Sequence, residues 1–112
     1  AQNRCGIVVW SLANAASSVH DTGSDGAATS SALTADIDVP ANGTAVALVS
    51  TQVDSGDASW SGLDKDVETT VSSGMVSGAS KDFSAAQSDL TVTGTTVGNQ
   101  RPTFVTASWG PL

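Results

Sequence analysis

The sequence predicts an all-β protein, an antiparallel β-sandwich of six to eight strands with jelly-roll-like connections. Two observations support this fold class. Apolar and polar residues alternate over several short stretches, which is typical of strands with one buried face. Turn-forming Gly, Asn, Asp and Ser residues recur between these stretches at intervals that suit short antiparallel strands, and no stretch shows a convincing helical period.

The clearest pattern lies in residues 37–50, "IDVPANGTAVALVS". Asn42-Gly43 readily supplies the positive φ angles of a tight turn, so the two flanking stretches are expected to form a β-hairpin. Because side chains alternate along a strand, this pairing would gather four apolar residues on one face. The expected pairs are Val39 with Val46 and Ile37 with Leu48.

The other strands are expected where similar patterns recur. The expected ranges are 4–12, 31–39, 44–53, 67–71, 88–96 and 102–109, and 81–87 is open between a short strand and one helical turn. Residues 13–30 and 54–66 are expected to be loops, and "SSGMVSGAS" (72–80) breaks the pattern. The inward side chains are expected to be Leu33, Ala35, Ile37, Val39, Leu90 and Val92. Val105, Ala107 and Trp109 are expected to share one face of the last strand.

Length and charge limit the classes of protein and of partner. The 112 residues form one expected domain, 1–112, and the lack of a starting Met suggests a processed chain or a piece of a longer one. The formal net charge is −7, and the four basic residues do not cluster. Nucleic acid and anionic membranes both require clustered Lys and Arg, so neither is an expected partner. No apolar stretch is long enough for a membrane span.

Metal and cofactor chemistry has little support in the sequence. Cys5 is the single cysteine, which excludes an internal disulfide and a multi-cysteine zinc site, and it is expected to be a buried structural thiol. The acidic stretches 21–26, "DTGSDG", and 54–57, "DSGD", place carboxylates at spacings that could help to hold calcium. Neither matches the EF-hand pattern, and their carboxylates are expected to cap nearby backbone instead. No metal and no cofactor is therefore predicted.

Catalytic residue types are scarce. His20 is the single histidine, and a Ser/His/Asp arrangement would have to use it, with Asp21 as its neighbour. No Gly-x-Ser-x-Gly motif occurs, and the chain is not expected to be an enzyme. A hydrolytic domain would require His20 to contact a Ser or Asp in a cleft.

Three tryptophans raise the alternative of carbohydrate binding. Trp10 and Trp109 lie within predicted strands and are expected in the core. Trp60, in "ASWSGL", is the one candidate for an exposed ring that stacks on a sugar, with Asp57 and Asp64 as nearby polar groups. The other interpretation is that Trp60 packs over the end of the sandwich.

Three phrases of the sequence carry a family resemblance: "NRCGIVVWSL" near the start, "VPANGTAVALVS" in the middle and "GNQRPTFVTASWGPL" at the end. Together they resemble small β-sandwich domains in structural proteins of tailed bacteriophages and related prophage elements. The likeness consists of strand and turn phrases, so no site residue is carried over from it.

That resemblance implies a non-enzymatic module on the surface of the virion, an extracellular particle. The module would be a capsid decoration or head-fibre domain, or a domain of a tail or adhesion protein. Its expected partners are other virion proteins and copies of itself. The alternative is a carbohydrate-binding module of an adhesin or secreted enzyme, with Trp60 as the stacking platform and a host-surface glycan as the partner.

Overall fold

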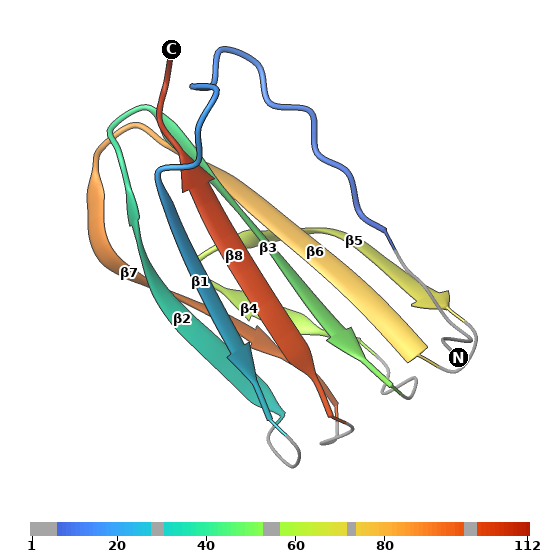
Figure 1. Cartoon of the computed structure of the whole chain (residues 1–112). Helices are drawn as coiled ribbons and strands as arrows, with labels where there is room; N and C mark the ends of the chain where they lie inside the picture. The colour runs from blue at the N-terminus through green and yellow to red at the C-terminus, as the bar shows by residue number, and fades with distance from the viewer. Residues whose placement is uncertain (1–6, 28–30, 53–56, 72–73, 98–100) are drawn as a thin grey trace.

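The computed structural model describes residues 7–27, 31–52, 57–71, 74–97 and 101–112, and in these ranges it contains eight strands and no helix (Figure 1). They form two antiparallel sheets, one of five strands in the order β1-β8-β3-β6-β5 and one of three in the order β2-β7-β4. The predicted all-β sandwich is confirmed. The strands are β1 Asp21–Gly26, β2 Ala32–Val39, β3 Gly43–Thr51, β4 Ser59–Ser61, β5 Asp64–Val71, β6 Gly74–Phe83, β7 Gln87–Thr95 and β8 Thr103–Trp109.

The pairing of strands explains the jelly-roll character. β1 pairs with β8, β2 with β7 and β3 with β6, all antiparallel. These nested pairs are what a long hairpin gives when it is rolled up into two layers. β5 departs from this scheme, because it pairs with β6 in the larger sheet and leaves β4 at the edge of the smaller one.

The core lies between the two sheets and is mainly aliphatic. Leu33, Ile37 and Val39 of β2 are almost fully buried, as is Val92 of β7, while Ala35 and Leu90 pack at the margin of the core. The predicted inward faces of these two strands are therefore confirmed. Burying one large apolar side chain contributes about 1.5–3 kcal/mol. The five-stranded sheet supplies the opposite side, with Ala45, Ala47, Val49, Met75, Ala79 and Phe104.

The predicted hairpin is wrong, although its turn exists. Asn42 has a φ of 59°, and the Gly43 N–H donates to the Pro40 carbonyl oxygen at 2.9 Å. The turn moves the chain from one sheet to the other, so β2 and β3 are not hydrogen-bonded partners. The alternating pattern correctly gave the buried side of β2, but it could not specify the partner, which is β7 about 55 residues further along the chain.

The expected pairs of Val39 with Val46 and Ile37 with Leu48 are consequently absent. Val39 and Ile37 face the interior. Val46 and Leu48 lie on the outer face of the five-stranded sheet, opposite in parity to the inward Ala45, Ala47 and Val49.

The predicted orientation of β8 is also wrong. Val105, Ala107 and Trp109 do share one face, but it is the outer one, and Val105 is 52% exposed. The inner face carries Phe104 with two buried hydroxyls. Thr106 Oγ1 donates to the Val46 carbonyl oxygen at 2.9 Å, and Ser108 Oγ donates to the Asp38 carbonyl oxygen at 2.6 Å. Because these hydrogen bonds compensate for the lost water contacts, polar residues occupy positions that the pattern assigned to solvent.

Three strands lie where loops or breaks were expected. β1 lies within 13–30, β4 lies within 54–66, and β6 covers residues 74–80 of the "SSGMVSGAS" stretch. Part of the open range 81–87 is also strand, since Lys81–Phe83 ends β6 and Gln87 begins β7. These strands are rich in Gly, Ser and Asp, which sequence patterns associate with turns.

The predicted strand 4–12 is not a strand in its described part. Residues 7–12, which we call the N-terminal arm, run extended beside the outer face of the five-stranded sheet (Figure 1). Trp10 is therefore outside the core, and Trp109 also lies on the outer face. The prediction for Cys5 falls outside the described residues.

Candidate functional site

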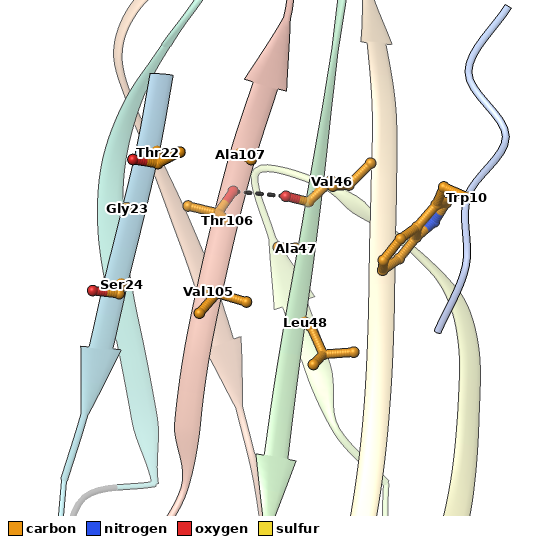
Figure 2. Close-up of a pocket in the computed structure, with 10 residues that line it drawn as sticks. All are labelled: Trp10, Thr22, Gly23, Ser24, Val46, Ala47, Leu48, Val105, Thr106 and Ala107. Carbon is orange, nitrogen blue, oxygen red and sulfur yellow. Dashed lines mark hydrogen bonds between the residues drawn. The ribbon is translucent and has the colours of Figure 1, made fainter. Parts of the chain in front are cut away.

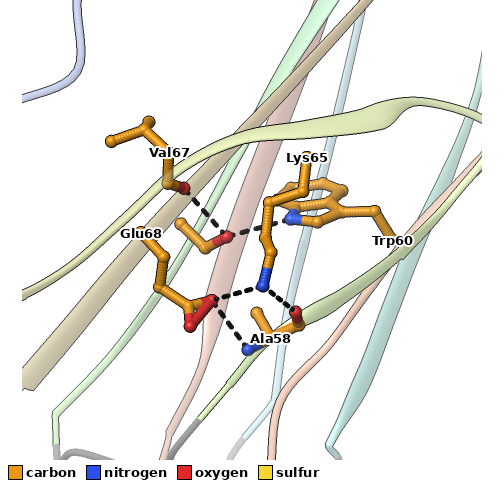
Figure 3. Close-up of polar contacts among 6 residues, drawn as sticks. Ala58, Trp60, Lys65, Val67 and Glu68 are labelled. Atoms are coloured by element: carbon orange, nitrogen blue, oxygen red, sulfur yellow. Dashed lines mark hydrogen bonds and ion pairs between the residues drawn. The ribbon is translucent and has the colours of Figure 1, made fainter.

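The three residues proposed for sugar binding do not form an exposed platform. The Trp60 side chain is partly buried against the core, with its ring centroid 6.1 Å from that of Phe104. Its indole N–H donates to Ser77 Oγ at 3.0 Å (Figure 3). Asp57 is exposed just before β4, whereas Asp64 belongs to the other sheet and pairs with Lys81 at 3.7 Å. The Trp60 ring therefore packs against the core, and it is not the exposed ring that sugar stacking requires.

The residues weighed for catalysis and metal binding are also dispersed. His20 is exposed, and its backbone N–H donates to the Ser108 carbonyl oxygen at 2.7 Å. Among the described residues, no hydrogen bond joins its imidazole to a Ser or Asp side chain, and no group of three or more His, Cys, Asp and Glu could hold a metal ion. Those same ranges hold no helix long and apolar enough to cross a membrane.

One edge of the three-stranded sheet is closed by carboxylates from β1. Asp21 Oδ2 accepts from the Asp38 N–H at 2.8 Å, and Asp25 Oδ2 accepts from the Thr34 N–H at 2.9 Å. Both donors lie on edge strand β2, where no further strand pairs with it. The two carboxylates therefore replace part of a missing ladder, which blocks pairing of this edge with another chain.

The same carboxylates also bind their own strand. Asp21 Oδ1 accepts from the Thr22 N–H and Asp25 Oδ1 from the Gly26 N–H, both at 2.8 Å. Gly23 lies between the two aspartates, and a Cβ placed there would come 2.7 Å from the Ala35 Cβ. A larger residue would push β1 away from β2. The sequence showed this site only as two Asp residues four apart around a glycine, and its role required knowing that β1 and β2 are neighbours.

Acid should weaken this edge through Asp21. The hydrogen bond from the Asp38 backbone, then that from Thr22, lowers the pKa of Asp21 below its ordinary value of 3.8, with a smaller contribution from His20 and against a small opposing effect of desolvation. A carboxyl whose pKa is lower in the folded than in the unfolded protein stabilises the fold at pH values above its unfolded-state pKa. This contribution is lost as the pH falls through its folded-state pKa. We expect Asp21→Asn to destabilise the protein at neutral pH and by less at about pH 3, which lies below the ordinary value of 3.8.

Urea midpoints of the two proteins at both pH values measure this effect. The Asp82→Asn variant is a suitable control, because Asp82 lies on β6 away from this edge and accepts from Thr44 Oγ1. A gap between wild type and Asp21→Asn that stays equal at both pH values would contradict the assignment.

The opposite edge of the three-stranded sheet is closed by a charged pair from β5. Glu68 Oε2 accepts from the Ala58 N–H at 2.8 Å, and Lys65 Nζ donates to the Ala58 carbonyl oxygen at 3.1 Å (Figure 3). The two side chains lie 3.5 Å apart as an ion pair. Lys65 thus gives the backbone beside β4 a donor, and Glu68 gives it an acceptor, as a neighbouring strand would.

The outer face of the three-stranded sheet is polar and internally hydrogen-bonded. Thr91 Oγ1 donates to Asp36 Oδ1 at 2.6 Å, and Thr93 Oγ1 donates to Thr34 Oγ1 at 3.2 Å. Asp38 Oδ1 accepts from the Asp89 N–H at 2.8 Å. These side chains satisfy one another across β2 and β7, as expected for a face that stays in water.

The outer face of the five-stranded sheet is different, because it carries an uncharged groove. A groove of about 460 Å³ lies on this face. Trp10 lies at one side of it and β1 at the other (Figure 2). None of the ten residues that line it is charged. They are Trp10, Thr22, Gly23, Ser24, Val46, Ala47, Leu48, Val105, Thr106 and Ala107. We call the side of the five-stranded sheet that bears this groove the outer face.

The arm is fixed beside the groove by Trp10. Its indole N–H donates to Asp66 Oδ2 at 3.0 Å, and its ring lies over β6, where a Cβ on Gly78 would come 2.8 Å from the ring carbon Cζ2. Gly78 therefore allows the ring to lie close to the sheet. Ile7 and Val9 on the same arm are 80% and 82% exposed.

In the described ranges the groove is lined by apolar side chains, hydroxyls and backbone, without a titratable group to transfer a proton. Comparison of the chain with protein-family models, with curated proteins and with solved structures gave no match.

Proposed function

We propose that this chain is a non-enzymatic structural module of a bacteriophage virion surface, as a capsid decoration or head-fibre domain or as a domain of a tail or adhesion protein. It acts through protein–protein packing. The observation that carries the proposal is the uncharged groove with the exposed apolar side chains of Ile7, Val9 and Val105 on an otherwise acidic chain. A contiguous exposed apolar surface of this kind is typical of an interaction site.

The blocked edges of the smaller sheet support the same function. A module present in many copies must avoid uncontrolled strand pairing, and charged side chains at strand edges prevent it. Asp21, Asp25, Lys65 and Glu68 occupy the edges of β2 and β4, so contacts are directed to the outer face. The resemblance of the strand and turn phrases to domains of tailed-phage structural proteins favours a virion as the setting.

Purified particles test the proposal. Particles released from cells that encode the chain would be banded in a density gradient, and the chain would be quantified by mass spectrometry against the major shell protein. We expect it in the particle band in many copies, with antibodies against it labelling intact particles in electron micrographs. An abundant cytoplasmic protein from the same lysate controls for carry-over. Recovery of the chain only outside the particle band would overturn the proposal.

A further inference from the structure

We infer that the outer face binds a second copy of this chain, in a two-fold interface in which the N-terminal arm of each copy lies in the groove of the other. This inference rests on the proposed function, since it names one of the partners through which the module packs.

The first support is shape. The arm forms a ridge over the β6 side of the five-stranded sheet, and the groove lies next to it over β1, β8 and β3 (Figure 2). A two-fold axis that lies in the interface plane, parallel to the strands and between ridge and groove, places each ridge over the groove of the other copy. A two-fold interface requires one self-complementary patch, and a ridge beside a groove meets that requirement.

The second support is the apolar side of the arm that no described residue covers. Ile7 and Val9 project away from the sheet with at least 80% of their surface exposed, while Val8 and Trp10 are partly buried. Val105, 52% exposed, lines the groove. Bringing Ile7 and Val9 of one copy against Val105 of the other buries apolar groups that each monomer leaves in water.

The third support is charge. The chain carries a formal net charge of −7, so two copies repel each other wherever acidic surfaces meet. The residues that line the groove are uncharged, whereas Asp36, Asp38 and Asp89 lie on the three-stranded sheet, on the far side of the sandwich. Asp66 borders the arm, and its carboxylate accepts the Trp10 indole N–H. Association through the groove and the arm therefore brings uncharged residues together and keeps the carboxylates of the three-stranded sheet apart.

The available area is sufficient for such a dimer. The molecule measures 39 by 23 by 22 Å along its principal axes. A face of these dimensions offers on the order of 900 Å², compared with about 800 Å² per partner in a standard protein interface. Most of the outer face would have to take part, which agrees with the placement of the arm and the groove side by side across it.

Sedimentation equilibrium of the purified chain tests the inference. We expect a species of twice the 11.1 kDa chain mass at micromolar concentrations, and we expect Val105→Asp to weaken the association by on the order of 100-fold, because it places an unpaired charge in each half of the interface. Val97→Asp is the matched control. Val97 is 60% exposed beyond the end of β7, so the same substitution there should leave the dimer intact.

The possible outcomes test the dimer interface and the proposed function separately. A wild-type chain that remains monomeric at high concentration contradicts it, as does a Val105→Asp variant that dimerises as well as Val97→Asp. If the wild-type chain is monomeric and Val105→Asp alone is lost from particles, a different virion protein occupies the face. A dimer that is sensitive to Val105→Asp but absent from particles would support the interface and contradict the proposed function. The two claims can thus fail separately.

Discussion

Replacing Phe104 with alanine is expected to lower the free energy of unfolding by about 3–5 kcal/mol, a large part of the stability of a small domain. The Phe104 side chain is 1% exposed and contacts the Trp60 ring within the core. Its strand, β8, is held between β1 and β3 in the five-stranded sheet, so the backbone has little freedom to close the cavity. Urea denaturation followed by tryptophan fluorescence measures the loss.

The next residue on the strand gives the control. Val105 points to the opposite side of β8 and is 52% exposed, so Val105→Ala should change the free energy of unfolding by less than about 1 kcal/mol. Both variants should be compared at a chain concentration low enough to avoid association. A larger loss for Val105→Ala than for Phe104→Ala would restore the orientation that the sequence pattern predicted and contradict the structure.

Replacing Glu68 with alanine is expected to lower the free energy of unfolding by about 1–3 kcal/mol, because the buried Ala58 N–H loses its acceptor. Ala58 is 3% exposed, so water has little access to the freed donor. Lys65 also loses its charged partner at this edge. Glu68→Gln keeps an acceptor oxygen and should retain most of the stability, which separates the hydrogen bond from the charge.

The same variant should also open the β4 edge to strand pairing. We expect Glu68→Ala to form thioflavin-binding aggregates sooner than wild type under mildly destabilising conditions, since an unprotected edge is a template for another chain. Equal stability and equal aggregation of Glu68→Ala and wild type would show that this carboxylate does not protect the edge.

Sequence patterns predicted the fold class and the buried sides of β2 and β7, because each of these strands has one face in water. Leu33, Ile37 and Val92 alternate with polar residues there, and the parity is unambiguous. β3 and β8 have apolar side chains on both faces, since the arm and the outer face add a second apolar surface. Alternation alone could not choose between Phe104 and Val105 as the inward residue.

The missed strands and the missed edge contacts have a common physical cause. Gly23 lies in the stretch expected as a loop, and Gly78 lies in the stretch that breaks the alternation. Each glycine permits a close approach, Gly23 to Ala35 across the seam between β1 and β2 and Gly78 to the Trp10 ring. Asp21 and Asp25 have partners 17 and 9 residues away in sequence. Such contacts follow from the three-dimensional path of the chain, and a local pattern carries little information about that path.

Amide hydrogen exchange tests most directly the central claim, which is that side chains close both edges of the three-stranded sheet. The backbone amides of Thr34, Asp38 and Ala58 should exchange as slowly as amides paired between strands. Asp25→Ala should accelerate exchange at Thr34 and Asp21→Ala at Asp38, each with little effect on the other amide. Exchange of all three amides at the rate of exposed loops in the wild-type protein would contradict the account.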